Sequence, residues 1–523
     1  MKETRGFVIF PIVFSMYPIF HLYAQNMGRV EYSDFLETLM ISMVATLLLL
    51  LLLNSFLRDY VKSGFCSLVL LAWFFSYGHI HDGMLLNGHV RFSMLRHTYL
   101  VPLWTSLALA ACMVIHKLSG RLSSVTLHLN LVAVFLVTMP LATIAVRQVS
   151  AHYVRIAVDV DSAGSLGAVE CSGKPDIYYI ILDGYAREDI LRDYFGYDNS
   201  EFIEALTTRG FYVAADSRSN YPQSFLSLAS SLNMEYLNYF GQTIGKESLD
   251  PLIPMGMIRN SKVMRILDAL GYTTITVGSG WGPTDYNPLF DINFRYGTIT
   301  LFQMDLLSTT ILQPVANPFF RLMTQRNRVL RNLDKLAEAS NIEGPKFVFA
   351  HLTTPHPPFV FNRDGGPAYG PVDTISVNYV MASSQWLPKS AYVEQLIFLN
   401  GEVIKLIDAL MSNSDVSPVI ILQSDHGPAS EGQDAERRHA FQTLAAGEWD
   451  KKTERILRER MSILNAYHMP GVGGNLLYSS ITPVNSFRLL LDSYCDPGFE
   501  LLEDRSSLSL YKRPYDFVDV PDW

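Results

Sequence analysis

Long apolar runs occupy residues 1–150, and shorter apolar runs separated by polar segments follow them. A transmembrane helix needs about 20 apolar residues, and five runs approach or reach that length. They are 6–24, 38–57, 65–82, 99–116 and 127–146. We therefore expect about five transmembrane helices. The first is expected to be a retained anchor, because further apolar runs follow it and no small-residue cleavage site ends it.

The orientation of these helices follows from the basic residues between them. With an internal N-terminus, the inside segments hold six Lys and Arg and the outside loops hold three, as the positive-inside rule requires. Five spans then place the rest of the chain on the periplasmic or extracellular side of an inner (plasma) membrane. Four spans would place it in the cytoplasm, so the run that carries His79, His81 and Asp82 decides the compartment.

A linker over residues 151–174 and an α/β domain over residues 175–523 are predicted after the apolar region. Three strand-length runs are continuously apolar, as is typical of strands buried on both faces. They are 175–182, 347–350 and 419–422. Apolar residues recur at helical spacing over 391–411. Strands that alternate with helices predict a mainly parallel central sheet with its site at the strand ends.

Composition and charge exclude two classes of protein. Residues 1–150 contain 10 Lys and Arg against 6 Asp and Glu, so the remainder contains 31 against 44. An acidic domain without a basic stripe is not typical of nucleic-acid binding. An aromatic content of 12% excludes a disordered chain.

The four cysteines fall into two pairs of different character. Cys66 and Cys112 lie in apolar runs, where a buried thiol is an ordinary small hydrophobic group. Cys171 and Cys495 lie near the start and the end of the large domain. They either pair, if the compartment is oxidising, or remain free thiols.

Acidic and imidazole side chains follow two of the predicted strands. Asp183 ends the first strand, and Asp425 and His426 follow the third. These groups suit zinc or manganese, and they would meet at one edge of a parallel sheet. An Asp-His-Gly sequence by itself can also be an ordinary turn. Its combination with Asp183 and a further histidine motif favours a metal site.

Ser224 is the candidate nucleophile. Pro222 can open a helix, which would place Ser224 in its first turn, where free amides and the helix dipole favour an oxyanion and a bound phosphate. A metal on the same hydroxyl would lower its pKa further. The neighbouring Ser227, Ser230 and Ser231 are interpreted as packing residues of that helix.

Four segments, in this order and spacing, resemble the sulfatase-like branch of the alkaline phosphatase superfamily. They read IYYIILDGYARED, NYPQSFLSLAS, FAHLTTPHPPFVF and ILQSDHGP. The layout of apolar spans before an outer domain is similar to that of phosphoethanolamine transferases and lipoteichoic acid synthases. The resemblance implies an alkaline-phosphatase-like domain with one divalent ion on Asp183, Ser224, Asp425 and His426. It also implies that His356 contacts the transferred phosphoryl oxygens.

The sequence departs from that family at several points. The similar transferases have Glu and Thr where this chain has Asp183 and Ser224. No CxPxR-type sequence, which true sulfatases convert to formylglycine, follows the first strand. That absence disfavours sulfate esters. His439 resembles a substrate-side histidine but also suits a solvated helix, and His351 and His468 are interpreted as structural.

The sequence thus predicts a membrane-anchored, metal-dependent phosphotransferase. A phosphoethanolamine or phosphoglycerol head group would move from a phospholipid donor to a surface glycan or glycolipid through a covalent Ser224 intermediate. A phosphate or sulfate ester hydrolase and a non-catalytic scaffold for envelope assembly are the alternatives. Specificity is expected to reside in the segments 278–345 and 361–390, between the strands.

Overall fold

The chain divides into two compact units in the computed structural model. One unit comprises Met1–His152 and Thr298–Arg321, and the other comprises Tyr153–Gly297 and Leu322–Trp523. The structure describes all residues except a set of short segments. These are 1–6, 87–96, 119–121, 163–170, 172, 298, 316–317, 369–385, 415, 432–433, 474–475 and 496–497.

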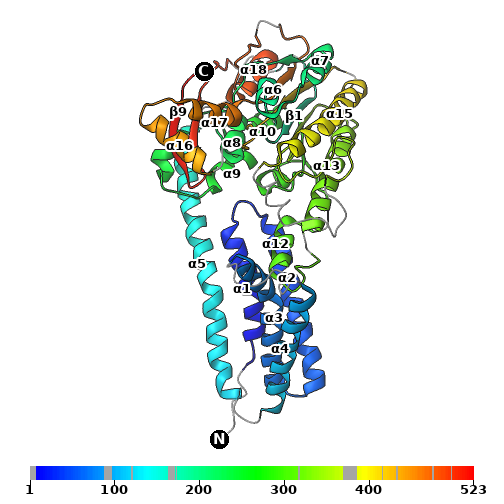
Figure 1. The fold of residues 1–523 in the computed structure, drawn as a ribbon, viewed down its shortest axis with the longest axis vertical. Helices are drawn as coiled ribbons and strands as arrows, with labels where there is room; N and C mark the ends of the chain where they lie inside the picture. The colour runs from blue at the N-terminus through cyan, green and yellow to red at the C-terminus, as the bar shows by residue number, and fades with distance from the viewer. Residues whose placement is uncertain are drawn as a thin grey trace. The chain divides into compact units, whose positions relative to one another are not determined.

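The five predicted apolar runs form helices, and these lie in the first unit except for the end of the fifth helix, beyond residue 152. They are α1 (Phe10–Gln25), α2 (Tyr32–Leu57), α3 (Tyr60–Leu86), α4 (His97–Lys117) and α5 (Leu122–Ser162). Helices α1 to α4 lie side by side, and α5 is the long cyan helix (Figure 1). In the described residues, four of these helices, α2 to α5, are long and apolar enough to cross a membrane. Helix α1 has 16 residues and contains Pro18.

The histidine-bearing run forms one continuous helix. His79, His81 and Asp82 all lie within α3, which is among the four candidate spans. The uncertainty about the number of spans therefore concerns α1 and not this run. Leucines on α2 are exposed, as expected of a helix that faces lipid.

An insertion from the large domain belongs to the first unit. Within it, α12 (Leu301–Thr309) begins at a capping box in which Thr300 and Gln303 bond each other's backbone amides. The backbone amide of Ile311 then donates to the Phe74 carbonyl of α3 at 2.8 Å. The sequence predicts one continuous domain over 175–523 and does not indicate that 298–321 belongs to the helical unit. Helix α5 also continues into residues 151–162, which were expected to be linker.

A seven-stranded sheet organises the second unit, in the order β2-β7-β6-β1-β5-β3-β4. The strands are β1 (Ile177–Leu182), β2 (Tyr212–Val213), β3 (Thr273–Val277), β4 (Ile292–Phe294), β5 (Lys346–Leu352), β6 (Val419–Gln423) and β7 (Asn465–His468). Strand β1 is parallel to both β5 and β6. Only β7 pairs in antiparallel fashion, with β6 and β2. The predicted fold class is therefore confirmed.

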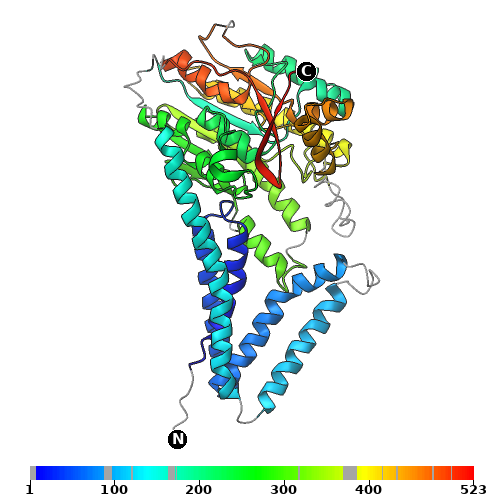
Figure 2. The same ribbon diagram turned by 90° about the vertical axis from the view of Figure 1, so that its left-hand side faces the viewer.

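Helices and a hairpin complete this unit. The helices are α6 (Glu188–Phe195), α7 (Ser200–Thr208), α8 (Ser224–Asn233), α9 (Leu252–Arg259), α10 (Lys262–Ala269), α11 (Gly282–Asp285), α13 (Pro318–Ala339), α15 (Lys389–Asn413), α16 (Asp434–Ala445), α17 (Lys451–Met461), α18 (Pro483–Cys495) and a short π-helix at Gly241–Gly245. Strands β8 (Ser506–Leu510) and β9 (Arg513–Val520) form the twisted red hairpin in Figure 2. Much of 278–345, the first of the two segments expected to determine specificity, is helical.

The strands of the centre are buried because both faces of the sheet are covered. Every residue of β1 and β6 is buried. Tyr179 of β1 packs edge-on against Phe487 of α18, with ring centroids 4.8 Å apart. The same core cluster includes side chains of α8, α9 and α10. This packing fixes the ends of β1 and β6, from which the candidate site extends.

Cys171 and Cys495 form a disulfide across a sequence separation of 324 residues. It joins the segment before β1 to the end of α18. The sequence left this pairing open, and the structure places the two sulfur atoms together. Cys66 and Cys112 are free.

Candidate active site

Three predicted ligands meet where the central strands end. Asp183 directly follows β1, and Asp425 and His426 follow β6, the parallel neighbour of β1. One ligand atom from each of the three lies within 4.8 Å of the others, and all three residues are buried. The amide of Gly184 donates to Asp425 Oδ1 at 3.2 Å and so ties the two strand ends together. The topology thus explains why residues 242 positions apart share one site.

The donor atoms of this group fit a cation. Asp183 Oδ1 and Asp425 Oδ2 are buried and accept no hydrogen bond of normal geometry from the described residues. They lie 3.6 and 3.4 Å from His426 Nε2. His426 Nδ1 lies 3.0 Å from the Gly427 carbonyl, which can only accept, so Nδ1 carries the proton and Nε2 offers a lone pair. A divalent ion would satisfy all three atoms.

The ionisation states of these groups also suit a cation. Burial and then the charge of Asp183 raise the pKa of Asp425 to about 7. Burial would raise the pKa of Asp183 too, but the neighbouring imidazoles of His356 and His351 hold that pKa well below its usual range. Burial and the charge of Arg460 lower the pKa of His426, which keeps its ring neutral.

Ser224 stands at the first position of α8, as the position of Pro222 predicted. Its Oγ lies 3.1 Å from His426 Nε2, so the candidate nucleophile adjoins the three ligands. The N–H groups of a first helical turn are available to an anion. The site therefore combines a hydroxyl, a carboxylate pair and a helix N-terminus.

Two glycines allow the strand ends to approach other groups closely. Gly184 has φ +76°, and a Cβ there would lie 2.3 Å from the ring of Trp386. At Gly427, a Cβ would lie 2.1 Å from the backbone oxygen of Glu459. Both positions thus leave no room for a side chain, and Gly184 in addition has a backbone conformation that favours glycine.

The buried Arg460 connects the loop before Ser224 with the loop after β6. Its Nε donates to the Pro222 carbonyl at 2.9 Å, and its Nη1 donates to the Gly427 carbonyl at 2.8 Å. Hydrogen bonds from a charged group are stronger than neutral ones. Arg460 therefore holds Ser224 and His426 in one arrangement, a role that the sequence did not suggest.

His356 lies beside the same group. Its amide donates to the Asp183 carbonyl at 2.9 Å, and its ring lies 4.8 Å from that of Trp386 and 6.1 Å from that of His426, between centroids. The ring Nδ1 lies 2.6 Å from the Pro357 carbonyl, which directs its proton there. Its Nε2 is thus left for another partner at this edge of the sheet.

His351 contacts a candidate ligand, although the sequence interpretation gave it a structural role. Its Nε2 lies 3.4 Å from Asp183 Oδ2, and its Nδ1 lies 2.9 Å from Thr284 Oγ1. His351 pairs with Ile181 in the β1–β5 register. Two adjacent parallel strands that both end in polar residues were the signal that could have indicated this contact.

Two other histidines have partners of a different kind. His439 Nε2 lies 3.0 Å from Asp450 Oδ2, and the side chain is 40% exposed. His468 Nδ1 lies 2.8 Å from the Pro418 carbonyl. His439 is not part of the group around His426, and its assignment to substrate stays a prediction.

Comparisons with known structures find similar folds at low identity. The C-terminal periplasmic domain of EcEptC from Escherichia coli, in complex with Zn, is 13% identical with a TM-score of 0.43, covering 67% of this chain and 94% of that one. Phosphoethanolamine transferase EptA from Neisseria meningitidis is 13% identical with a TM-score of 0.39, covering 94% and 96%. Phosphonate monoester hydrolase of Agrobacterium radiobacter is 11% identical with a TM-score of 0.39, covering 64% and 80%.

Sequence comparison gives the family. No curated protein sequence matches the chain. The family model described as Sulfatase matches residues 175–466, which confirms the resemblance that the motifs indicated. Because this match spans more than half of the chain, the protein belongs to the sulfatase family and is a sulfatase-like enzyme.

Proposed function

We propose that this protein is a membrane-anchored, metal-dependent phosphotransferase. It moves a phospho-head group, of the phosphoethanolamine or phosphoglycerol type, from a phospholipid to a cell-envelope glycan or glycolipid. The observation that carries the proposal is the position of Ser224 Oγ, 3.1 Å from His426 Nε2 beside a buried carboxylate pair. A hydroxyl at a helix N-terminus next to a cation site is suited to nucleophilic attack on phosphorus.

One divalent ion, zinc or manganese, would be held by Asp183, Asp425, His426 and the Ser224 hydroxyl. When bound, it would stabilise negative charge on the phosphoryl oxygens and on the attacking oxygen. Carboxylate and imidazole donors suit either metal. The two unpartnered carboxylate oxygens of the described structure support this assignment.

The reaction proceeds in two displacements. Ser224 Oγ, having lost its proton, forms a bond to phosphorus, and the bond from phosphorus to the diacylglycerol oxygen breaks. That oxygen takes a proton and leaves as diacylglycerol. An acceptor hydroxyl then attacks phosphorus of this serine phosphodiester, which still carries the head group; the acceptor hydroxyl loses its proton, the bond from phosphorus to Ser224 Oγ breaks, and Oγ takes up a proton. His356 would donate from Nε2 to the equatorial oxygens when its ring is protonated.

The helical unit supports a lipid donor and an outer location. Four candidate spans would hold the enzyme at a bilayer, where a phospholipid is the abundant phosphodiester. An odd number of crossings, with α1 as the fifth, would place the domain on the periplasmic or extracellular face of the inner membrane. The Cys171–Cys495 disulfide is consistent with an oxidising compartment.

Ser224→Ala tests the proposal, with Ser227→Ala as the matched control. Both serines lie on α8, and the Ser227 hydroxyl is buried without a hydrogen-bond partner among the described residues. The full-length protein in detergent is given phosphatidylethanolamine or phosphatidylglycerol, and diacylglycerol release and the mass of the Ser224 peptide are measured.

We expect Ser227→Ala to keep the activity and Ser224→Ala to lose it by roughly a thousandfold or more. The mass added to the wild-type peptide identifies the transferred group. Undiminished diacylglycerol release by Ser224→Ala would refute the covalent mechanism. Release of a water-soluble phosphate product without any acceptor would favour the hydrolase.

A further inference from the structure

The large unit contains a pocket that none of the three candidate metal ligands lines. Its volume is about 300 Å³, and it lies between helix α16 and the β8–β9 hairpin. Nine residues line it: Asp434, Arg437, Arg438, Phe441, Gln442, Leu510, Tyr511, Lys512 and Arg513. Four of them are cationic and one is acidic. The sequence did not suggest this pocket, because its two sides are more than 60 residues apart in the chain.

Two of the four cations are available to a ligand. Arg513 pairs with Glu247 and Asp516, and Arg437 lies 3.5 Å from Asp434. Arg438 and Lys512 are both exposed. In the described part of the chain, neither has a carboxylate within 4.0 Å. Two exposed cations without counterions that line one pocket favour an anion, and the fork of Arg438 suits phosphate.

The walls of the pocket are apolar and aromatic. Three of the nine lining residues, Phe441, Leu510 and Tyr511, give it this surface, and the Arg437 guanidinium lies 4.6 Å from the centre of the Tyr511 ring. Such a wall packs against the C–H face of a ligand ring, whereas an ion alone needs only donors. Exposed cations and an aromatic wall together fit a phosphorylated sugar.

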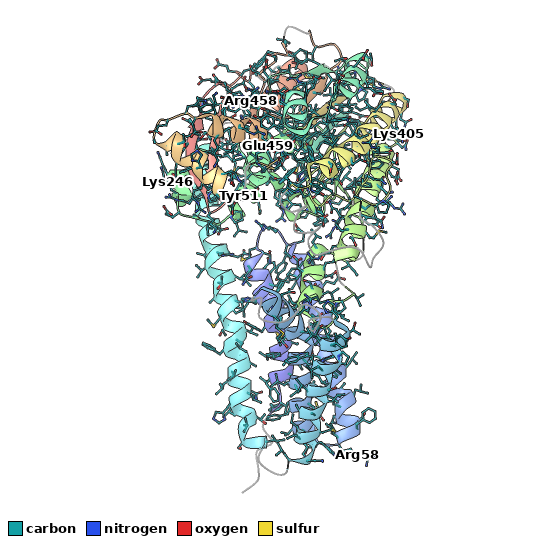
Figure 3. The ribbon with its side chains drawn as sticks, in the orientation of Figure 1. Arg58, Lys246, Lys405, Arg458, Glu459 and Tyr511 are labelled. Atoms are coloured by element: carbon teal, nitrogen blue, oxygen red, sulfur yellow. A yellow bond between two sulfur atoms is a disulfide. The ribbon has the colours of Figure 1, made fainter. Side chains whose placement is uncertain are left out.

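One side chain connects this pocket with the candidate active site. The hydroxyl of Tyr511 lies 3.4 Å from Arg460 Nη2. Arg460 also donates to the Pro222 and Gly427 carbonyls, on either side of Ser224 and His426. Figure 3 labels Tyr511 near α16 and, on the other side of the same unit, Lys405 of α15. A ligand that contacts Tyr511 is thus linked, through Arg460 alone, to the backbone that positions the nucleophile.

We propose that this pocket binds a phosphorylated sugar of the acceptor, so that the acceptor is an anionic glycan or glycolipid. The assignment of the ligand to the acceptor rests on the proposed transferase function. Arg438 and Lys512 contact the phosphate, and the exposed ring of Tyr511 contacts the sugar ring. The reacting hydroxyl lies on another part of the same glycan and reaches Ser224 from this anchored position.

Binding tests the pocket independently of activity. The full-length protein in detergent is titrated with glucose 6-phosphate, with glucose and with inorganic phosphate, by isothermal titration calorimetry. The test variant is the double substitution Arg438→Glu and Lys512→Glu, and the control is Lys405→Glu, an exposed cation on α15. Both variants change exposed residues, and circular dichroism checks that they fold.

We expect glucose 6-phosphate to bind more tightly than glucose. The double variant should weaken glucose 6-phosphate binding by about a hundredfold, because each lost charged contact accounts for about a tenfold change. Lys405→Glu should not change it. Equal affinities of the double variant and the control would overturn the pocket assignment. Inorganic phosphate bound as tightly as glucose 6-phosphate would overturn the sugar component.

A kinetic test separates this inference from the proposed function. Diacylglycerol release reports the first displacement, and transfer to a phosphorylated glycan reports the second. We expect the double variant to raise the KM for that acceptor about tenfold or more, with the change confined to the second displacement. An unchanged acceptor KM overturns the acceptor assignment. Absence of diacylglycerol release by the wild type refutes the transferase itself and leaves the binding result standing.

Discussion

Gly427→Ala should displace the loop that carries Asp425 and His426. The added Cβ would lie 2.1 Å from the Glu459 carbonyl oxygen, 3.1 Å from the Ser462 oxygen and 3.2 Å from the Arg460 carbonyl carbon. Ordinary contacts of a Cβ are 3.4–4 Å long. All three neighbours are backbone atoms, so no flexible side chain can move away. The loop must therefore shift by roughly 1 Å, since packed interiors hardly yield.

Such a shift has a large effect on catalysis and a smaller one on stability. A displacement of about 1 Å in a reacting group reduces the rate by about a hundredfold. Overpacking of this kind destabilises a protein by about 1–3 kcal/mol. The Gly427 amide also donates to the Arg460 carbonyl at 2.7 Å, so the shift strains that bond as well. We expect kcat to fall far more than the free energy of unfolding.

Gly401→Ala is the matched control. Gly401 lies within helix α15, and no atom lies within 4 Å of the Cβ that would be added there. This substitution should keep the activity and stabilise the helix by up to about 1 kcal/mol. Diacylglycerol release, metal content and thermal unfolding are measured for both variants. Wild-type metal affinity and kcat in Gly427→Ala would contradict the close-approach explanation.

Three further predictions concern the same unit. His351→Ala should weaken metal binding by about 10–100-fold, because it removes the imidazole beside the Asp183 carboxylate. His468→Ala is the control. Equal metal affinities of the two variants in a competition titration would refute a role of His351 in metal binding. Replacing Cys171 and Cys495 by Ser should destabilise the protein by about 2–5 kcal/mol, and an unchanged Tm without reductant would show that the bond contributes nothing. Metal affinity should fall about tenfold per pH unit below 7, because burial and Asp183 raise the pKa of Asp425 to about 7 and the ligand must be deprotonated. A flat affinity between pH 5 and 7 would contradict this sign.

The sign of that pH dependence follows from the folded and unfolded values. The pKa of an unfolded aspartate is about 3.9, so burial favours the protonated form of Asp425 in the metal-free fold. The metal-free protein therefore loses stability as the pH rises toward 7, while its metal affinity increases over the same range. As the pH rises toward 7, the unfolding temperature should thus fall without metal and rise with metal. A general effect of pH on stability would shift both in the same direction.

The sheet and its ends were predictable because burial on both faces leaves a direct mark on the sequence. The runs at 175–182 and 419–422 are continuously apolar, and each ends in the residues that form the site. Such runs do not reveal the order of the strands in the sheet, but parallel strands always have their carboxyl ends at the same edge. Asp183 and the Asp425-His426 pair could therefore be brought together before their pairing was known.

Other features depend on contacts between distant segments. The nine residues of α12 are mostly apolar, but nothing in that short run indicates that its unit is the helical one. The role of Arg460 is visible only through the two carbonyl groups to which it donates, and these lie in segments far from it in the sequence. The pairing of Cys171 with Cys495 was open for the same reason, since two cysteines 324 residues apart carry no local signal.

A bound cation would balance the negative charge of Asp183 and Asp425 better than any change in the protonation of the site's own residues. Asp183 stays ionised beside its histidines, while burial pushes Asp425 toward its neutral form. The charge of the buried Arg460 does not outweigh this effect, and its guanidinium already donates to two carbonyl groups. A bound divalent ion would ionise Asp425, use the lone pair of His426 and lower the pKa of the Ser224 hydroxyl at once. A metal site and an activated serine are therefore expected to be lost together when any of these ligands is removed.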